Sequence, residues 1–470
     1  MPIAKKKPTT VVKKKTVAPK KAGSASAATD ASKDAQKKVK LFQPIRGMKD
    51  ILPKDDWYWL RVFDVVRNMT RAYGYRYSEP PVLESAQLFV KSIGKGTDVI
   101  DKEMYVFDDQ EANKLALRPE FTAGVARSYI SNGLLNNAQP VKLWMLGPLF
   151  RHDRPQAGRY RQFHQFNCEV IGEKDPVIDA ELIIMAYNVV RDLGISPEVH
   201  INSIGSLEDR QNYIIELQGY LRSKKSYLSE ESKKRMLKNP LRILDSKEEQ
   251  DQEVIAEAPQ IIDWLSAESK DFFMKVLEYL DELQIPYVLK PTLVRGLDYY
   301  SDTVFEIYNE KTEQGTQSAL GGGGRYDGLL EQLGAREMTP ASGFALGIER
   351  VISAMKELDQ QEGAPNTKRD TMQNTIFFAQ LGGQGRRRAL LLIEELRRAG
   401  IMVGSSLSKG SLKGQLEMAN KQGATHCIIL GQKEVQDGTV IIRDMSSGVQ
   451  EIIDQKRLEK HLQKLLQSHI

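Results

Sequence analysis

The spacing of apolar positions predicts two long helices in the first half of the chain. The first follows Asp55, a favourable N-cap residue, and stops at Gly74. The second ends at Gly194. Apolar residues recur at helical spacing in both: Trp57, Leu60, Phe63, Val66, Met69 and Tyr73 in the first, and Ile178, Leu182, Met185, Val189 and Leu193 in the second.

Short extended stretches lie between and after these helices, at residues 142–146, 163–171, 303–308 and 344–346. The charged segment 205–285 has few β-branched runs, which favours an inserted helical segment. Strands, an insertion and further strands follow one another without regular strand–helix alternation. We therefore predict an α+β fold with a mostly antiparallel sheet and helices around it.

The rhythm changes after a polar linker at residues 360–373. Beyond it, strands at 375–379, 401–405, 426–430 and 440–443 alternate with helices at 386–399 and 411–422, and a last helix follows. This alternation predicts a small α/β domain of ordinary size. The predicted organisation is a tail (1–40), a first domain (41–365, with the insertion at about 205–285) and a second domain (374–470).

Charge is distributed unevenly along the 470 residues, although 41% of them are hydrophobic and the net charge is only +5. Residues 1–40 hold twelve Lys and two Asp, with no aromatic residue and no Leu, so we expect them to be disordered. Residues 41–370 are net acidic and the last hundred are net basic. The tail fits a solvated segment, an arm for nucleic-acid phosphates or a transit peptide; the absence of Arg argues against the last, and we favour a non-targeting tail.

Several classes of protein are disfavoured. Cys168 and Cys427 form no CxxC pair, so neither a disulfide framework nor a cysteine zinc site is expected. The six histidines include no HExxH. No apolar run is long enough to span a membrane, and the N-terminus lacks the apolar core of a secretory signal. We expect a soluble, reduced, intracellular protein with no metal site of its own.

Polar residues that suggest chemistry gather first in residues 146–172. A strand ending at Arg151 leads into an arginine-rich loop, and on the returning strand Gln165, Asn167 and Glu169 share one face. Guanidinium groups bind phosphate as bidentate forks, and the amide and carboxylate suit one small polar ligand. The alternative is an exposed hairpin with ion pairs on its surface.

Three further segments carry unusual residues. LVRGLDYY, which begins at Leu293, makes a polar turn before a strand, and ALGGGGRYDGLL, which begins at Ala319, holds four glycines that indicate close backbone approach or positive φ. This run is neither a Walker loop nor GxGxxG. ASGFALGIERV, from Ala341, reads as a strand followed by a helix. In LALRPEFT, from Leu115, we expect Pro119 to open a helix at its first turn.

Together these motifs resemble the class II histidyl-tRNA synthetases from about residue 45 to the C-terminus. LVRGLDYY and GGRYDGL are the segments that distinguish histidyl enzymes, FRHDRPQAGRYRQFHQ is similar to motif 2 and GFALGIER to motif 3. The resemblance implies a class II antiparallel-sheet catalytic domain with a helical insertion. SLKGQLEMANKQGA in the last hundred residues resembles the anticodon-binding domain of the family.

The resemblance also implies roles for individual residues. Arg151 is expected on the ATP α-phosphate, Arg350 on the γ-phosphate, and Arg295 on the α-phosphate and the histidine carboxylate. The candidates for the α-ammonium group are Glu120, Thr122 and Gln165, and those for the imidazole are Glu169, Tyr300, Tyr299 and Tyr326. Arg154, Gln156 and Arg159 are expected to reach the acceptor end of the tRNA.

The implied reaction joins L-histidine and ATP, with Mg²⁺ on the phosphates, to histidyl-adenylate and pyrophosphate, and then transfers histidine to tRNA-His. Cytoplasmic location and a homodimer formed through residues 73–81 are also implied. Two residues depart from the family, since Phe121 and Asn167 stand where Gly is common. Two alternatives are a histidine-sensing regulatory paralogue and an RNA-binding or signalling module; the three arginines and the final domain argue against both.

Overall fold

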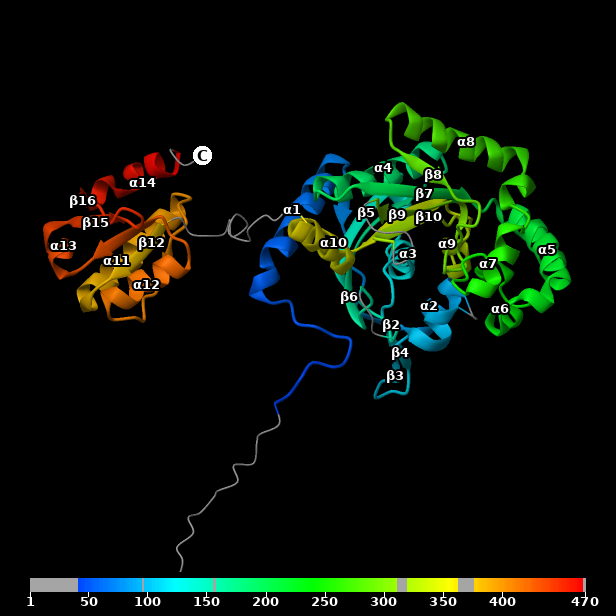
Figure 1. Cartoon of the computed structure of the whole chain (residues 1–470), viewed down its shortest axis with the longest axis horizontal. Coiled ribbons are helices and arrows are strands. Elements are labelled where there is room, and N and C mark those ends of the chain that lie inside the picture. The colour runs from blue at the N-terminus through cyan, green and yellow to red at the C-terminus, as the bar shows by residue number, and fades with distance from the viewer. Residues whose placement is uncertain (1–40, 95–96, 155–157, 311–318, 362–375, 468–470) are drawn as a thin grey trace, which may run out of the picture. The chain divides into compact units, whose positions relative to one another are not determined.

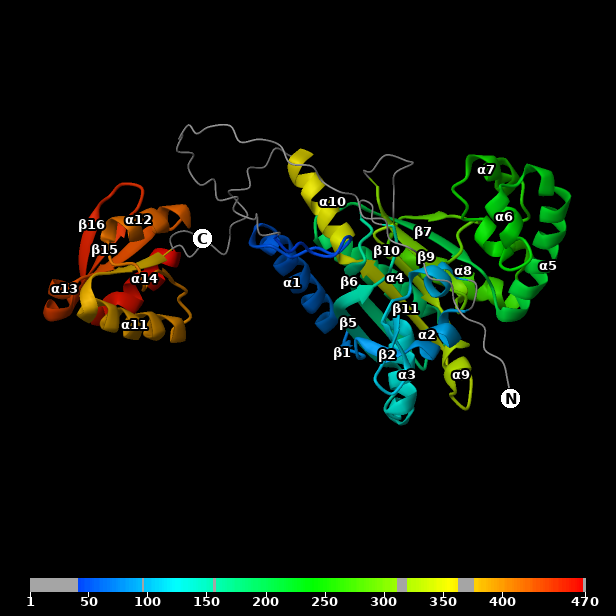
Figure 2. The ribbon, with the colours of Figure 1, turned by 90° about the horizontal axis from the view of Figure 1, so that it is seen from below.

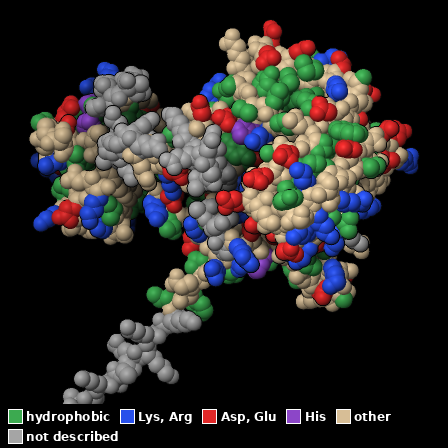
Figure 3. Space-filling view, turned by 45° about the vertical axis from the view of Figure 1, so that its right-hand side comes forward, with side chains coloured by type: hydrophobic (Ala, Val, Ile, Leu, Met, Phe, Trp, Pro, Cys, Tyr) green, Lys and Arg blue, Asp and Glu red, His purple; other side chains and the backbone are tan. Residues whose placement is uncertain are grey.

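The computed structural model describes residues 41–94, 97–154, 158–310, 319–361 and 376–467 (Figure 1). The predicted tail, most of the predicted linker and Gln156 lie outside these ranges. In the described part of the chain, no helix is long and apolar enough to cross a membrane. Acidic and basic side chains are interspersed on the face shown in Figure 3, as expected from 67 Lys and Arg against 62 Asp and Glu.

An eight-stranded sheet organises the larger part of the fold, in the order β1-β5-β6-β11-β10-β9-β7-β8. Its five inner pairs are antiparallel, whereas β1 and β8 at the edges pair in parallel with β5 and β7. The α+β fold and the mostly antiparallel sheet are therefore confirmed. The strands are β1 (Arg76–Tyr77), β5 (Val141–Phe150), β6 (Gln162–Ile171), β7 (Pro197–Ser203), β8 (Tyr287–Leu289), β9 (Ser301–Asn309), β10 (Gly321–Arg325) and β11 (Ala341–Gly347).

Alternation along the strands separates two apolar cores, one on each side of the sheet. Phe166 and Cys168 of β6 belong to the first core, which also contains residues of four helices (Figure 2). Gln165, Asn167 and Glu169 point to the other side, where they line the cavity described below. The helices of the first core are α1 (Asp56–Ala72), α4 (Pro176–Asp192), α8 (Ala267–Glu282) and α10 (Ile348–Gln361).

The two predicted long helices are present, but the most buried face of the first is shifted from the predicted stripe, four of whose residues are only partly buried against the first core. In α4 all five predicted apolar residues are buried, and Gly194 follows with φ +85°. In α1 only Val66 of the predicted stripe is fully buried, and the buried face is Tyr58, Trp59, Val62, Val65 and Val66. Asp55 is the N-cap position but makes no capping hydrogen bond; its carboxylate accepts from Lys356 of α10 instead.

Residues 205–285 are mostly helical and contain no strand, as predicted. Buried polar side chains cap the helices of this charged segment. Asp209 forms a capping box with Ser206 and also accepts a hydrogen bond from the Ser269 hydroxyl. These hydrogen bonds tie the start of α5 to the start of α8. Besides α8 the helices of the segment are α5 (Leu207–Ser223), α6 (Glu230–Arg235) and α7 (Glu249–Ala256), with short 3₁₀ turns between them.

A small three-stranded sheet and two helices lie earlier in the chain. The helix that Pro119 was expected to open, α3 (Thr122–Ser131), begins three residues later, with Phe121 as its N-cap. Pro119 and Glu120 are therefore loop residues, which leaves the carbonyl of Pro119 free to accept a hydrogen bond from Arg151. The other elements are α2 (Ala86–Ile93), β2 (Leu83–Ser85), β3 (Val106–Asp108) and β4 (Lys114–Leu117), in the sheet order β2-β4-β3.

A five-stranded sheet and four helices follow from residue 376 onward, with the strand order β13-β12-β14-β15-β16. The predicted alternation is confirmed, although the strand expected at 401–405 has only two residues and α13 and β16 were not predicted. The elements are β12 (Ile376–Gln380), α11 (Gly382–Arg398), β13 (Gly404–Ser405), α12 (Leu412–Lys421), β14 (His426–Leu430), α13 (Gln432–Asp437), β15 (Thr439–Asp444), β16 (Gln450–Asp454) and α14 (Leu458–Gln467).

Candidate active site

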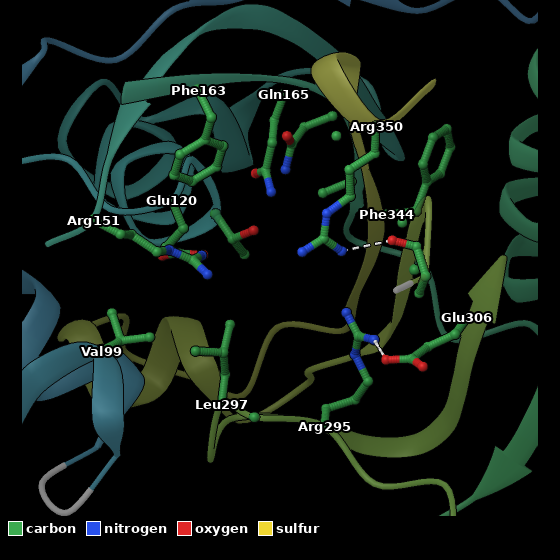
Figure 4. Close-up of a pocket in the computed structure, with 18 of the residues that line it drawn as sticks. Val99, Glu120, Arg151, Phe163, Gln165, Arg295, Leu297, Glu306, Phe344 and Arg350 are labelled. Atoms are coloured by element: carbon green, nitrogen blue, oxygen red, sulfur yellow. Dashed lines mark hydrogen bonds and ion pairs between the residues drawn. The ribbon is translucent and has the colours of Figure 1, made fainter. Parts of the chain in front are cut away.

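A cavity of about 440 Å³ lies over the middle of the large sheet, on the face that Gln165 and Glu169 share (Figure 4). Strands β6, β9, β10 and β11, the loop after Leu293 and the start of α10 form its walls. All the residues predicted for histidine and ATP line this cavity: Glu120, Thr122, Arg151, Gln165, Glu169, Arg295, Tyr299, Tyr300, Tyr326 and Arg350. Segments up to about 230 residues apart in sequence therefore meet at one place.

Two arginines that line the cavity are fixed by backbone carbonyls. Arg151 Nε donates to the carbonyl of Pro119 at 2.9 Å. Arg350 Nε donates to the carbonyl of Gly158 at 3.1 Å, and its Nη1 to the carbonyl of Ala319 at 2.6 Å. Burial, together with the nearby charges of Arg159 and Arg151, lowers the pKa of Arg350. Uncompensated positive charge of this kind favours a polyanionic ligand.

Arg295 projects from the opposite wall toward Arg350 (Figure 4). Its Nη1 donates to Glu306 Oε1 at 2.5 Å, and its guanidinium carbon lies 5.5 Å from the centre of the Tyr300 ring. Burial alone would lower the pKa of Arg295, but Tyr300 and Glu306 raise it above its ordinary value. Its Nε is buried and has no hydrogen-bond partner among the described residues. Arg295 is thus a fixed positive charge whose Nε–H remains available to donate a hydrogen bond to a ligand.

Glu120 places a second kind of charge in the cavity. Its Oε1 accepts from the backbone N–H of Ala123, in the first turn of α3, at 2.7 Å, and its Oε2 accepts from the Tyr299 hydroxyl at 3.0 Å. Burial raises the pKa of Glu120 in spite of these hydrogen bonds. A cation bound beside Glu120 would offset this desolvation, as expected for an ammonium-binding carboxylate.

Glu169 is the most strongly perturbed carboxyl group in the cavity. Thr122 donates to its Oε1 at 2.8 Å and Tyr326 to its Oε2 at 2.5 Å. Burial raises the pKa of Glu169 to about 8, with a contribution from the charge of Glu120. At neutral pH the ligand-free site therefore holds a proton that it can share with a basic ring nitrogen.

Replacing Glu169 by glutamine is expected to stabilise the ligand-free protein, and more so at pH 7.5 than at pH 5.5. The folded protein retains a proton that the unfolded chain, with an ordinary pKa of 4.5, has released. The stability of the wild type therefore falls as the pH rises between about 4.5 and 8, by up to about 3 kcal/mol over the two units from pH 5.5 to 7.5, and the uncharged glutamine removes this loss. Thermal unfolding at both pH values tests this, with the exposed Glu268→Gln as the control. An equal difference in Tm at both pH values would contradict it.

The glycines of the sequence motifs leave space for these side chains. A Cβ built on Gly343 would lie 1.7 Å from Glu169 Oε2, and one on Gly322 would lie 2.4 Å from the carbonyl of Phe305 and 2.9 Å from Arg295 Nη1. The prediction of close approach at the glycine run is confirmed. The run is also a central strand, β10, which was not predicted.

Several residues of the cavity were missed from sequence. Glu306 was not singled out, although strand alternation in VFEIY could have placed it on the face opposite Phe305. Glu349 was noted only as part of a helix start; it accepts from the backbone N–H of His164 and lies 2.8 Å from His164 Nδ1. Phe163 also lines the cavity. These contacts join distant segments, so spacing in the sequence does not reveal them.

The residues predicted to bind tRNA do not all line the cavity, unlike those predicted for histidine and ATP. Arg159 lines the cavity and pairs with Asp153 at 3.2 Å, whereas Arg154 belongs to the same loop and is exposed. Gln156 lies outside the described residues. The roles of all three stay predictions.

Comparison with known families gives two matches. The family model described as histidyl-tRNA synthetase matches residues 47–351, and the model described as an anticodon binding domain matches residues 381–465.

Solved structures give the same result. A histidyl-tRNA synthetase from S. aureus in its apo form is 33% identical, with 90% of this chain and 99% of that chain covered and a TM-score of 0.73. A histidyl-tRNA synthetase from Nostoc sp. PCC 7120 (20% identity, 91% and 100% coverage, TM-score 0.63) shares the fold. So does a Bacillus halodurans protein described as an ATP phosphoribosyltransferase regulatory subunit/histidyl-tRNA synthetase (22% identity, 83% and 98% coverage, TM-score 0.58).

Proposed function

The chain belongs to the histidyl-tRNA synthetase family and is a histidine–tRNA ligase, and from this premise we propose which of its residues carry out the reaction. The observation that carries the proposal is the convergence of three arginines and two buried carboxyl groups on one cavity. The arginines suit the phosphates and carboxylate of the reactants, and the carboxyl groups suit the ammonium and the imidazole.

Histidine binds with its α-ammonium beside Glu120, Thr122 and Gln165. Its imidazole enters the part of the cavity formed by Glu169 and the tyrosines, where the carboxyl group and hydroxyls read the ring by hydrogen bonding. The tyrosines of this part are Tyr299, Tyr300 and Tyr326. An apolar side chain of similar size would leave these buried polar groups unpaired, which can give roughly 10⁴-fold discrimination without editing.

ATP binds among the three arginines that line the cavity. Arg151 holds the α-phosphate and Arg350 the γ-phosphate, while Arg295 contacts both the α-phosphate and the histidine carboxylate. A carboxylate oxygen of histidine attacks the α-phosphorus. The bond between the α-phosphorus and the oxygen that bridges it to the β-phosphate breaks, and pyrophosphate leaves. Arg295 stabilises the negative charge that grows during this step, so the protein acts by positioning and electrostatics and needs no covalent intermediate.

Mg²⁺ accompanies the nucleotide in this proposal. Glu306 and Glu349 line the cavity, and one or two carboxylates plus substrate phosphates are the ligands that Mg²⁺ commonly takes in ATP sites. When bound, the ion would neutralise phosphate charge. Histidine is then transferred from the adenylate to the 3′ end of tRNA-His, guided by Arg154, Gln156 and Arg159, while the basic residues 374–470 hold the anticodon region.

Replacing Arg154 by alanine is expected to lower aminoacylation of tRNA-His while leaving histidine activation unchanged. Arg154 is exposed, and among the described residues only its backbone N–H is hydrogen-bonded, to the Asp153 carboxylate. We expect a loss of up to about tenfold in kcat/KM for tRNA, the size of one phosphate contact, measured by charging assays beside ATP–pyrophosphate exchange. Arg191→Ala, on the surface of α4, is the control. An equal loss in both assays would contradict a role in tRNA binding.

We also propose a cytoplasmic homodimer. Residues 73–81 carry the exposed Tyr77, and the three-stranded sheet that follows in the chain carries exposed apolar residues, Leu83, Val106 and Phe107. Exposed apolar groups of this kind mark interaction surfaces, and a second copy is the commonest partner for a soluble enzyme. Light scattering of the full chain should give the mass of two copies; the mass of one would contradict the proposal. The cytoplasmic location is supported by the composition of residues 1–40, which hold no Arg, whereas transit peptides are rich in Arg.

A further inference from the structure

Asn167 lies in the middle of the wall that reads the amino acid. It is on β6 between Gln165 and Glu169, on the same face as both, and it pairs across the sheet with Met145 of β5 and Ala345 of β11. Only 3% of its surface is exposed, and it lines the cavity. Asn167 takes no part in the apolar core on the other side of the sheet, to which its neighbours Phe166 and Cys168 belong.

The side-chain oxygen of Asn167 is buried and has no hydrogen-bond partner among the described residues. An unpaired buried acceptor costs about 1–3 kcal/mol, so a partner is expected in the working state of the site. Three hydroxyl groups in this part of the cavity are already used: those of Thr122 and Tyr326 donate to Glu169, and that of Tyr299 donates to Glu120.

The orientation of the amide follows from its neighbour. Burial raises the pKa of Glu169, and among the hydrogen bonds that oppose this rise is one from the side chain of Asn167. The only donor in an asparagine side chain is its amide nitrogen. The nitrogen therefore faces the carboxyl group of Glu169, and the oxygen is left for a donor that the ligand brings.

We propose that Asn167 is a specificity-determining residue whose Oδ1 accepts a hydrogen bond from the imidazole N–H that Glu169 does not contact. This inference rests on the proposed function. The α-ammonium has acceptors of its own in Glu120 and Gln165. On the ring, Asn167 acts beside Glu169, its neighbour on the same face of β6, and together with the Tyr300 hydroxyl. With the shared proton on Glu169, the neutral ring still has one N–H for Asn167; with the proton on the ring, both N–H groups have an acceptor.

ATP–pyrophosphate exchange tests the inference with Asn167→Ala, which removes the acceptor, and Asn167→Asp, which keeps an oxygen at the same position. We expect the alanine variant to raise KM for histidine about tenfold, the value of one hydrogen bond to a buried group, with KM for ATP unchanged. Thr303→Val is the matched control, because the Thr303 hydroxyl is also buried and unpaired but does not line the cavity.

Ring-methylated histidines distinguish hydrogen bonding from a change of pocket shape. In the alanine variant, kcat/KM for one of the two N-methylhistidine isomers should rise relative to kcat/KM for histidine, because its methylated nitrogen no longer meets Asn167. The other isomer should stay rejected. The aspartate variant should keep the wild-type order. An unchanged KM for histidine, or an equal gain for both isomers, would overturn the inference while leaving the proposed function intact. Absence of histidine-dependent exchange in the wild type would instead overturn the proposed function.

Discussion

Replacing Arg295 by methionine is expected to lower kcat for histidine activation by about 10²- to 10³-fold, the loss seen when one fixed donor to a developing charge is removed. Arg295 lines the cavity with its Nη1 fixed by Glu306, and its buried Nε has no hydrogen-bond partner in the described part of the chain. Because these contacts hold the guanidinium before substrate binds, it needs no reorganisation during the reaction. Methionine keeps much of the volume of the side chain and removes its charge.

Pre-steady-state formation of the adenylate is the measurement that isolates this step. Arg191→Met, on an exposed arginine paired only with its neighbour Asp192, is the control. A folded Arg295→Met protein that forms adenylate at the wild-type rate would remove Arg295 from the mechanism. Thermal unfolding of both variants separates a loss of charge from a loss of fold.

Replacing Gly343 by alanine adds one methyl group and is expected to abolish most of the histidine activation. The new Cβ would lie 1.7 Å from Oε2 and 2.7 Å from the carboxyl carbon of Glu169, and 2.7 Å from the backbone carbonyl of Cys168. Since β11 is paired on both sides, it cannot move away, so the Glu169 side chain must leave its place. We expect kcat/KM for histidine to fall by about 10²-fold or more, as for a site whose ring-binding group is lost.

The matched control is Gly328→Ala. Gly328 precedes the short helix α9 (Leu329–Leu333), has φ of −80°, and a Cβ there meets nothing within 4 Å. Exchange assays should therefore show wild-type activity for this variant. Full activity of a folded Gly343→Ala protein would contradict the position given to Glu169.

The two long helices show what apolar spacing can and cannot predict. In α4 the predicted stripe is buried as expected, because the helix packs into the first core and ten of its residues are buried. In α1 apolar residues occupy a wide arc, so several stripes fit the spacing equally well. Packing selected the one that contains Tyr58, Trp59 and Val62.

The glycine run shows a different limit. Gly321–Arg325 has little intrinsic strand propensity, and its composition is typical of a loop. The run is a strand because β9 and β11 pair with it on both sides. A Cβ on Gly321 or Gly323 would lie about 2 Å from a carbonyl oxygen of β11. Tertiary packing thus overrides local preference.

The candidate site was predicted where contiguous motifs carry it, and missed where it depends on pairing between distant segments. The arginines and tyrosines stand in long motifs, and all of the described ones expected for histidine and ATP line the cavity. Glu306 and Glu349 gain their roles only from partners, Arg295 and His164, that the fold brings to them. Asn167 was noticed as a departure, but only the fold shows that its oxygen is unpaired.

Amino-acid-dependent ATP–pyrophosphate exchange, measured without tRNA for each of the twenty amino acids, tests the central claim most directly. The cavity as described predicts exchange with histidine alone, because its arginines complete the ATP site and its buried carboxyl and hydroxyl groups are matched only by an imidazole. Exchange with another amino acid at a comparable rate, or none with histidine from protein shown to be folded, would contradict the account.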